Sequence, residues 1–315
     1  MKDMEIHEFI IQWMHSFLAD RKQRVKIGKQ ISNWLQLNGG MPQGTWLGIY
    51  IFLILINDLT TEDAKLHKFV DDVTMTEILE RGETSEMQST LNQVLDWSNS
   101  NLMNINYKKT KEMLFGAIHR EPPPILHLSD KPIERVEAFK LLGLMITDSL
   151  TWNDNTSLLC SKANKRLHFL KLLKRSGIST TDLLYYYTAV IRPVVEYSAV
   201  VWHASITAEQ SRQIDSIQRR AERIIGTNEC TGKLTPLKER RDQQTRKFFE
   251  TLLHPDNCLH DLVPAARDSG ATGRLRQTIP LSIPFARTER YKRSFLINAL
   301  SKFQQCESND VTFDI

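Results

Sequence analysis

The chain has 315 residues, of which 41% are hydrophobic and 25% are charged. This is ordinary globular usage, so the composition excludes a wholly disordered chain, and the length suffices for two domains with sizeable cores. The net charge is only +4. The overall charge therefore does not establish a nucleic-acid-binding protein, and the distribution of charge along the chain has to decide.

Further features of the sequence bear on the compartment. The cysteines Cys160, Cys230, Cys258 and Cys306 are widely spaced and form no Cys-x-x-Cys pair, which favours free thiols in an intracellular protein. The charged N-terminus has no apolar signal sequence behind it. The longest apolar run, 46–56, is shorter than the roughly 20 residues that span a bilayer. We expect an intracellular protein of the nucleus or cytoplasm, with no signal peptide and no membrane segment.

The hydrophobic pattern of the first half predicts short strands mixed with helices. In chain order, the expected elements are a helix over 6–18, a basic-faced strand over 24–27 that pairs with 31–37, a glycine-rich turn over 39–44, a buried helix from 46 to about 59, two short strands over 65–79, a helix over 86–102, a strand over 111–115, a proline turn over 121–124 and a strand over 139–146. The tryptophans are expected in the core, because no feature of the sequence selects one of them for stacking on bases.

The pattern changes after Asp148 and becomes almost entirely helical. Helices are expected over about 155–225, with a break at Pro193 and a basic amphipathic helix over 211–225. A stretch rich in Pro and Gly over about 254–284 is expected to be irregular, and a last helix is expected over about 287–303. The change in pattern places a domain boundary near residue 150.

Asp71 and Asp72 lie between the two strands expected over 65–79. Adjacent residues of a regular strand point to opposite faces, but in a tight hairpin turn both carboxylates can approach one place. Mg²⁺ prefers such oxygen ligands and leaves room for phosphate, and a pair of ions can stabilise the attacking and leaving oxygens of a phosphoryl transfer. An isolated Asp-Asp pair is more often a solvated hairpin tip, so the neighbouring motifs have to decide.

A second motif is the turn that contains Pro42, Gln43 and Gly44. Pro42 has a fixed φ, and Gly44 tolerates conformations that other residues resist. The backbone of such a turn can approach a ligand closely before the next helix begins. An ordinary junction between a loop and a helix explains the same residues.

The order of these motifs resembles the reverse transcriptases of non-LTR (LINE-type, jockey-like) retrotransposons. The resemblance rests on Gly-x-Pro-Gln-Gly at 40–44, an apolar helix that ends in Ile-Asn-Asp-Leu at 56–59, and Phe-Val-Asp-Asp at 69–72. Further matching segments lie at 16–25, 96–97, 104–111, 139–143, 191–197 and 201–203. The resemblance covers nearly the whole chain, and the ordered set of motifs is specific.

The resemblance implies an RNA-directed DNA polymerase that works with two Mg²⁺ ions, an RNA template and a DNA primer. Asp71 would be a metal ligand and Asp72 its less direct acidic partner. Lys109 would act as general acid toward pyrophosphate, although a solvated basic turn explains this lysine about equally well. Phe69 would pack under the hairpin, and 139–143 would hold the primer end. The residues implied in contacts to template, nucleotide or primer are Pro42, Gln43, Gly44, Phe69, Leu142 and Gly143.

Two departures from the family pattern bear on activity. The family carries another aspartate on a strand before the first helix expected here, and neither that strand nor the upstream fingers and endonuclease have a counterpart in this sequence. In addition, Ile49 and Tyr50 follow Gly48 where the family usually has proline. Without the partner strand, Asp71 and Asp72 keep uncompensated like charge. We therefore predict an N-terminally truncated member with weak Mg²⁺ binding and little or no polymerase activity.

Basic residues recur at helical spacing after residue 150. They are Lys162, Lys165 and Arg166, then Arg212, Arg219, Arg220 and Arg223, then several within 238–246. Lys and Arg on one helix face suit the phosphate backbone of a nucleic acid, and the resemblance places this region at the polymerase thumb. Interleaved acidic residues fit a solvated amphipathic face as well.

Together these features predict an α+β protein. Residues 1–150 are expected to form a partial reverse transcriptase palm of short antiparallel strands and helices, without the fingers and the first catalytic strand. Residues 151–315 are expected to form a mainly helical thumb-like and C-terminal region. The expected function is RNA-directed DNA synthesis by two-metal nucleotidyl transfer at Asp71 and Asp72. The alternatives are a catalytically dead nucleic-acid-binding remnant and an inert structural remnant.

Overall fold

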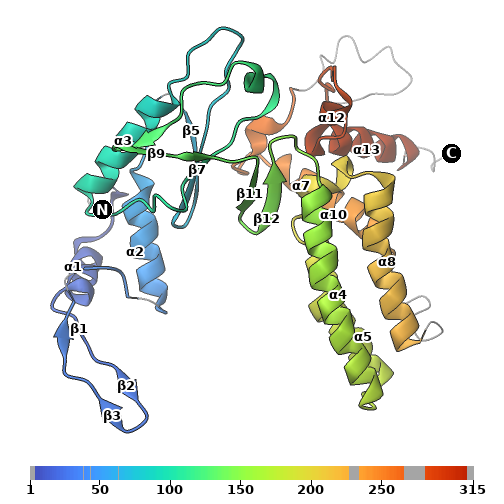
Figure 1. Cartoon of the computed structure of the whole chain (residues 1–315), viewed down its shortest axis with the longest axis horizontal. Coiled ribbons are helices and arrows are strands. Elements are labelled where there is room, and N and C mark those ends of the chain that lie inside the picture. The colour runs from blue at the N-terminus through green and yellow to red at the C-terminus, as the bar shows by residue number, and fades with distance from the viewer. Residues whose placement is uncertain are drawn as a thin grey trace. The chain divides into compact units, whose positions relative to one another are not determined.

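The computed structural model describes residues 4–37, 39–42, 44–62, 64–226, 234–265 and 281–310. The chain divides into two compact units, one of residues 1–112 with 120–135 and one of residues 113–119 with 136–315. Both units combine helices with short strands, so the fold is α+β (Figure 1). The assignment of residues 1–150 to a palm stays a prediction. No helix of the described ranges is long and apolar enough to cross a lipid bilayer.

The first unit begins with helix α1 (Glu8–Leu18), and a two-stranded ribbon follows it. In the ribbon, β1 (Lys22–Gln23) pairs antiparallel with β4 (Leu35–Gln36), and β2 (Lys26–Ile27) pairs with β3 (Gln30–Ile31). The remaining elements are α2 (Trp46–Asn57), β5 (Lys65–Phe69), β6 (Asp72–Thr76), α3 (Met87–Ser100), β7 (Lys111–Glu112), β8 (His127–Leu128), β9 (Lys131–Pro132) and β10 (Glu134–Arg135).

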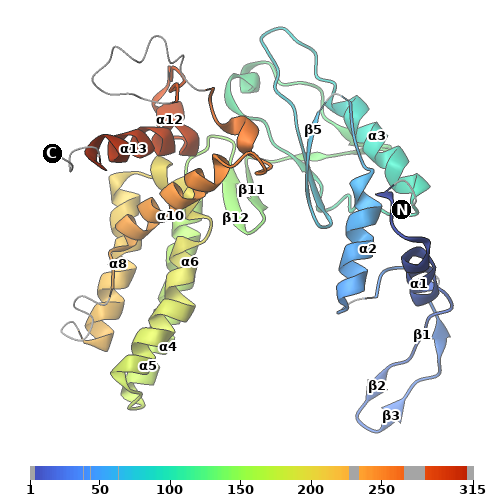
Figure 2. The same cartoon turned by 180° about the vertical axis from the view of Figure 1, so that it is seen from behind.

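Two small apolar clusters hold the first unit together. One contains Ile56 and Leu59 at the end of α2, Val94 of α3 and the inward side chains of β5 and β6. The other contains Leu91 of α3 and Leu128 of β8. Because Leu91 and Val94 lie within one helical turn, α3 contributes to both clusters. Figure 2 shows α2, α3 and β5 together in this unit.

Helix α2 was expected to be buried, and this is only partly confirmed. Gly48 and Ile51 are buried, but Trp46 is 80% exposed, and Tyr50 and Leu53 are exposed as well. The helix is apolar on all sides, which is typical of a helix surrounded by protein. Within the described residues, one side of the helix is covered and the other is exposed.

The expectation that the tryptophans lie in the core is wrong for three tryptophans of the first unit, whereas Trp97 of that unit is half-buried and packs against Ile56 and Val94. Trp13, Trp34 and Trp46 are exposed, whereas Trp152 and Trp202 of the second unit are buried. An aromatic side chain has a large apolar area, but its type does not say which surface covers it.

The second unit starts with a hairpin of β11 (Ala138–Leu141) and β12 (Leu144–Thr147). The expectation of one strand over 139–146 is wrong, because Leu142 and Gly143 form a tight turn and have φ values of 46° and 88°. The helices that follow are α4 (Asn153–Arg175), α5 (Thr180–Tyr186), η3 (Tyr187–Ile191), α6 (Arg192–Glu196), α7 (Ala199–Trp202), η4 (His203–Ser205), α8 (Ala208–Ile225), α10 (Leu237–Leu252), η5 (His260–Leu262), α12 (Glu289–Lys292) and α13 (Phe295–Asp310).

Helices α4 and α8 form the main core of the second unit. Their buried side chains recur at helical spacing, and they include Ala163, Leu167 and Leu170 of α4 and Ile214, Ile217 and Ala221 of α8. Asn153 accepts a hydrogen bond from Gln210 near the start of the two helices, and Lys174 donates to Ile225 near their ends. These contacts show that α4 and α8 run in the same direction side by side.

Pro193 does not break the helix as expected. A continuous helical path runs from Thr180 to Glu196, and its middle, η3, is a π-helical turn in which the N–H of Arg192 donates to Tyr187. Pro193 has no N–H, and its ring collides with the carbonyl group four residues earlier in a regular α-helix. The wider π turn accommodates the proline there.

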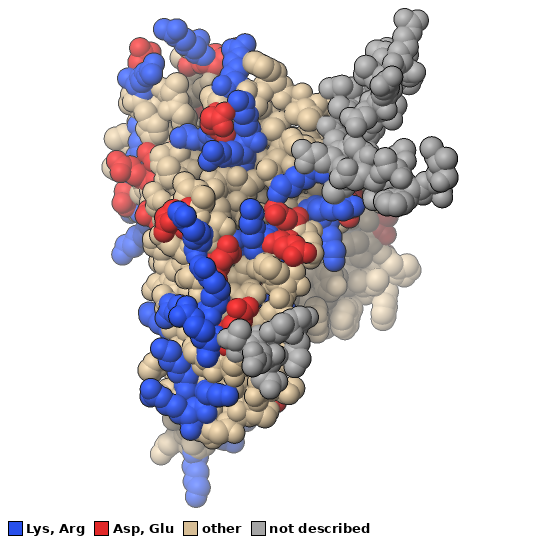
Figure 3. All heavy atoms as spheres, turned by 90° about the vertical axis from the view of Figure 1, so that its right-hand side faces the viewer, with Lys and Arg blue, Asp and Glu red and all other residues tan. Residues whose placement is uncertain are grey.

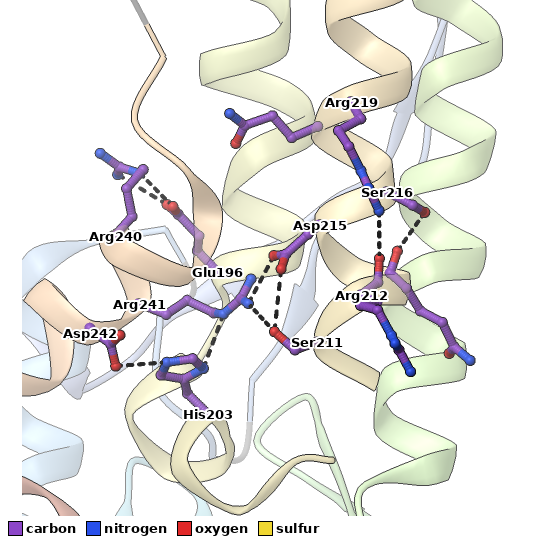
Figure 4. Close-up of polar contacts among 12 residues, drawn as sticks. Glu196, His203, Ser211, Arg212, Asp215, Ser216, Arg219, Arg240, Arg241 and Asp242 are labelled. Carbon is purple, nitrogen blue, oxygen red and sulfur yellow. Dashed lines mark hydrogen bonds and ion pairs between the residues drawn. The ribbon is translucent and has the colours of Figure 1, made fainter. Parts of the chain in front are cut away.

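A buried arginine joins three elements of the second unit (Figure 4). Arg241 of α10 is 0% exposed, and its guanidinium donates to Asp215 (3.0 Å) and Ser211 (3.2 Å) on α8. Its Nε donates to Nδ1 of His203 in η4 at 3.1 Å. Because Nδ1 accepts, Nε2 of His203 carries the proton and donates to Asp242 at 3.0 Å. Arg241 was expected among the surface basic residues of 238–246, and for this residue the expectation is wrong.

Asp242 extends the network to α13. Its carboxylate pairs with the ammonium group of Lys302 as well as with His203. Burial by itself raises the pKa of the Asp242 carboxyl, but the hydrogen bonds from His203 and Lys302 outweigh burial and lower the pKa from 3.8 to about 2.

Replacing Arg241 with alanine should destabilise the second unit by about 3 kcal/mol, because the change leaves a partly buried carboxylate and His203 without their partner. The matched control is Arg212→Ala on the same unit. Arg212 is 71% exposed and pairs with Glu209, and surface pairs contribute about 0–1 kcal/mol. Chemical denaturation of both variants measures the two losses, and equal losses would contradict the structural role of Arg241.

The stability of the protein should also depend on pH through Asp242. Its folded-state pKa is depressed, so its contribution is fully present above the ordinary pKa near 3.8 and is lost as the pH falls toward 2. Asp242 is 32% exposed, so allowance for screening leaves about 1–2 kcal/mol. Unfolding curves measured from pH 6 to pH 2 should show that the difference in free energy of unfolding between the unaltered protein and Asp242→Asn shrinks as the pH falls. A constant difference over that range would refute the assignment.

Candidate active site

The strands β5 and β6 form the expected hairpin, and one of its faces is buried. Leu66 pairs with Met75 across the hairpin, and both pack with Val73 against α2 and α3. The indole N–H of Trp97 on α3 donates to the carboxylate of Asp58 after α2 at 3.0 Å. The hairpin therefore rests on two helices that are themselves linked.

Lys68 ties the same hairpin to the end of α2. Its ammonium group donates to the carbonyl oxygens of Ile56 (3.0 Å), Asn57 (3.0 Å) and Leu59 (2.8 Å). The last carbonyl groups of a helix have no partner within the helix, and a lysine at this end also offsets the negative end of the helix dipole. Lys68 thus anchors the strand that leads to the two aspartates.

Val70 and Asp71 form the two-residue turn of the hairpin, since Phe69 pairs with Asp72. Val70 has a φ of 55°, which a β-branched residue rarely adopts. Such backbone costs on the order of 1–3 kcal/mol and persists only where the surrounding structure imposes it. The turn places Asp71 at the tip of the hairpin.

Asp72 begins β6 and lies on the outward face of the hairpin, opposite Phe69. Both side chains are exposed, Phe69 by 60%. The expectation that Phe69 packs under the hairpin is wrong, because the alternation that turns Leu66 and Lys68 inward turns Phe69 outward. Asp71 and Asp72 thus lie together at the exposed turn end of the hairpin.

The two carboxylates suit Mg²⁺ in their chemistry. They supply hard oxygen ligands, and Mg²⁺ is often held by one or two carboxylates while water and substrate phosphate fill the remaining positions. Among the residues that the structure describes, no group of three or more His, Cys, Asp or Glu side chains is placed to hold a metal ion. Metal binding by Asp71 and Asp72 stays a prediction.

The turn before α2 folds back onto the helix. The hydroxyl of Thr45 accepts from the N–H of Gly48 (3.2 Å) and donates to the carbonyl of Pro42 (3.2 Å), so Thr45 is the N-cap of α2. A Cβ atom on Gly48 would collide with that carbonyl oxygen, which explains the glycine. Gly44 has a φ of 77°. Gln43 lies outside the described residues, and its predicted contact with template or nucleotide stays a prediction.

Lys109 lies in a turn in the first unit. Its N–H donates to the carbonyl of Asn106 at 3.0 Å, and its side chain is exposed. Lys111 of the same basic segment pairs with Glu134, whereas no carboxylate in the described part of the chain pairs with Lys109. The role of Lys109 as general acid toward pyrophosphate stays a prediction.

Leu142 and Gly143 belong to the second unit, so their relation to Asp71 stays a prediction. The hydroxyl of Tyr197 donates to the carbonyl of Leu142 at 2.5 Å. A Cβ atom on Gly143 would lie 3.3 Å from the ring of Tyr197. The tip of this hairpin is therefore held against Tyr197, the residue that follows α6.

The basic residues of α4 divide into two kinds. Lys162 and Lys165 are exposed. Arg166 is partly buried and donates to the carbonyl of Val190 in the π turn, and its predicted phosphate contact stays a prediction. Figure 3 shows one face on which Lys and Arg predominate over Asp and Glu toward the lower end.

The first half of the chain is similar to a known family of polymerases. Residues 1–146 match the family model for reverse transcriptase (RNA-dependent DNA polymerase). This part of the chain, which contains the carboxylate hairpin and the Pro42–Gly44 turn, is therefore similar to reverse transcriptases.

The relatives confirm the resemblance to enzymes of non-LTR transposons. The chain is 24% identical to a probable RNA-directed DNA polymerase from transposon X-element of Drosophila melanogaster. The alignment extends over 277 residues and covers 85% of this chain and 30% of that protein. It is 22% identical to the RNA-directed DNA polymerase from mobile element jockey of the same species, over 80% of this chain and 30% of the relative. It is 21% identical to the RNA-directed DNA polymerase from mobile element jockey of Drosophila funebris, over 86% of this chain and 32% of the relative. The chain thus spans about a third of the length of these curated relatives.

Replacing Gly48 with alanine should lower the stability of the first unit by about 1–2 kcal/mol, because the new Cβ collides with the Pro42 carbonyl. Without this collision the substitution should stabilise the helix, since alanine is the better helix former by about 1 kcal/mol. A loss of stability therefore indicates the collision. In the control Gly39→Ala, the Cβ meets nothing within 4 Å, and we expect a change below about 0.5 kcal/mol. Thermal unfolding measures both variants. A Gly48→Ala protein as stable as the unaltered one would show that the turn does not pack on α2 as described.

Proposed function

We propose that this chain carries the carboxylate hairpin of an RNA-directed DNA polymerase, with Asp71 and Asp72 as its metal-binding pair. The observation that carries the proposal is the β5–β6 hairpin itself. Its Phe-Val-Asp-Asp sequence, inside the family match, spans a two-residue turn with strained backbone at Val70. Lys68 and three apolar side chains fix the hairpin to the helices behind it. In this proposal residues 1–150 are the palm and 151–315 a thumb-like and C-terminal region.

Each residue has a distinct role in the proposed reaction. Asp71 and Asp72 provide carboxylate oxygens at the turn of the hairpin. Bound Mg²⁺ supplies charge stabilisation for the attacking hydroxyl and the leaving pyrophosphate. Lys109 donates a proton to pyrophosphate, and the backbone of the Pro42–Gly44 turn positions the template base and the incoming nucleotide.

We further propose that the chain alone has little or no polymerase activity. In the described residues the hairpin forms a sheet of only two strands, and its aspartates have no third acidic or histidine neighbour suited to a metal. Trp13, Trp46 and Tyr50 leave an apolar surface on α1 and α2 uncovered in the same part of the structure. An exposed apolar surface of this kind marks a contact surface, and in this proposal further palm residues of a longer polymerase cover it.

A specific observation favours a second candidate function, nucleic-acid binding without catalysis. One exposed stripe of α4 combines lysines with large apolar side chains at helical spacing; it consists of Leu158, Lys162, Lys165, Phe169 and Leu172. Lysines neutralise phosphates, and the apolar side chains between them cover sugar and base surface. This stripe suits contact with a duplex whether or not Asp71 and Asp72 bind metal.

The metal proposal is tested with Mn²⁺ as a paramagnetic substitute for Mg²⁺. In the unaltered full chain, millimolar Mn²⁺ should selectively broaden the amide signals of residues 70–73, and this broadening should disappear in Asp71→Asn with Asp72→Asn. The control is Asp130→Asn, which alters an exposed aspartate in another two-residue hairpin turn of the same unit. Equal broadening at both turns would contradict a specific site at Asp71 and Asp72.

The same proteins serve for an incorporation assay with an RNA template, a DNA primer and dNTPs. We expect no incorporation above that of Asp71→Ala, because the partial site holds metal weakly. Template-dependent incorporation that Asp71→Ala abolishes would overturn the proposed inactivity and establish an active polymerase.

A further inference from the structure

The ribbon between α1 and α2 has an unusual distribution of charge. Its basic residues are Arg21, Lys22, Arg24, Lys26 and Lys29, and no Asp or Glu occurs between Asp20 and Asp58. All side chains from Lys22 to Gln36 are exposed. Figure 1 shows the ribbon as an arm that extends beyond α1. The ribbon is therefore a positively charged surface without internal ion pairs to neutralise it.

The register of the ribbon separates its side chains onto two faces. Gln23 pairs with Leu35 and Lys26 pairs with Ile31, so between the two ladders the returning segment is one residue longer than the first. Alternation then places Lys22, Arg24 and Lys26 on one side, which we call the basic face. The opposite face carries Gln23, Val25, Ile27, Gln30 and Leu35.

The basic face also carries an aromatic side chain. The guanidinium of Arg24 lies 4.5 Å from the centre of the Trp34 ring, which is a cation–π contact. Trp34 is exposed, and its stacking on Arg24 holds the ring in one orientation on the ribbon. Basic side chains combined with an exposed aromatic ring are the combination that binds single-stranded nucleic acid, because phosphates pair with the cations and unpaired bases stack on the ring.

The base of the ribbon is joined to the predicted template turn. Arg21 donates to the carbonyls of Leu18 (3.1 Å), Gly39 (3.2 Å) and Gly40. An open hollow of about 570 Å³ lies here, and Lys22 and Pro42 are among its lining residues. The basic face thus begins at a hollow shared with the Pro42–Gly44 turn.

We propose that the basic face of the ribbon binds a single-stranded nucleic acid, the unpaired template on its way to the Pro42–Gly44 turn. Lys22, Arg24 and Lys26 pair with successive phosphates, and Trp34 stacks on one unpaired base. The identification of the strand as template rests on the proposed polymerase function. A base-paired duplex offers no free base face to Trp34, so the ribbon prefers single strands.

The experiment measures binding of a fluorescently labelled, unstructured 20-nucleotide RNA to the full chain by anisotropy at several salt concentrations. Lys22→Gln with Lys26→Gln alters the basic face, and Gln23→Glu with Gln30→Glu is the matched control. Both pairs lower the net charge by two on exposed positions of the same ribbon. We expect the first pair to weaken binding at least about tenfold and to reduce the salt slope by about 1.4, at roughly 0.7 per phosphate contact. The control should weaken binding less than about threefold, because its residues lie on the opposite face.

Trp34→Leu tests the stacking contact. It should weaken binding of the single-stranded RNA, and of a DNA strand of the same sequence, while binding of an RNA duplex stays unchanged. Equal weakening by the two charge variants would overturn the proposal in favour of a general charge effect. Equal loss of duplex and single-strand binding in Trp34→Leu would also overturn it, and so would no loss of single-strand binding with either Trp34→Leu or the lysine pair. Circular dichroism and thermal unfolding verify that each variant is folded.

This result is separable from that of the metal test. The anisotropy measurement contains no divalent metal and no dNTP, and Asp71→Asn should bind the RNA like the unaltered chain. Loss of Mn²⁺ broadening with intact ribbon binding would count against the polymerase site alone. Intact broadening without binding at the basic face would count against the ribbon alone.

Discussion

The candidate site depends on the packing of one hairpin face against two helices. A two-stranded hairpin is marginally stable in water by itself, and this one also carries the strained backbone of Val70. Leu66, Val73 and Met75 offset that cost by packing against α2 and α3, since burial of such a side chain contributes about 1.5–3 kcal/mol when it is complete. Lys68 adds hydrogen bonds to the end of α2. Without these contacts, nothing in the described residues would hold Asp71 and Asp72 at a defined place.

The two units solve the problem of stability in different ways. The second unit has an extensive core between α4, α8 and the path from α5 to α6, and a buried network around Arg241 links α8, α10 and η4. A buried ion pair is weak evidence for net stability, so we regard the specification of one helix arrangement as its role. The first unit has two small clusters and leaves much of α1, the ribbon and α2 exposed. The first unit therefore has two exposed surfaces available for interaction. They are the uncovered face of α1 and α2 and the basic face of the ribbon.

Much of the fold follows from local patterns. Alternation around Asp71 and Asp72 predicts the β5–β6 hairpin, and helical periodicity predicts α1, α3, α4 and α8. The predictions that are wrong concern residues, such as glycine and proline, that are compatible with two different local structures. Gly143 was interpreted as a residue flanking one strand, but with Leu142 it forms a turn between two. Pro193 was interpreted as a break, but a π turn absorbs it. The last helical segment is divided into α12 and α13, and much of the stretch expected to be irregular over 254–284 lies outside the described residues.

The sequence by itself determined the resemblance to reverse transcriptases and singled out Asp71 and Asp72 as the candidate site. The order of Pro42-Gln43-Gly44, Asp71-Asp72 and the segments after them is sufficient for the family, because those residue types serve chemistry and tight backbone turns that few alternatives satisfy. Only the tertiary structure decided which side chains face solvent. It turned Phe69 outward, buried Arg241, tied Arg166 to Val190 and left Trp34 exposed beside Arg24. These outcomes depend on contacts between residues far apart in the sequence, and neither charge nor aromatic character indicates in advance which partner will cover a given side chain.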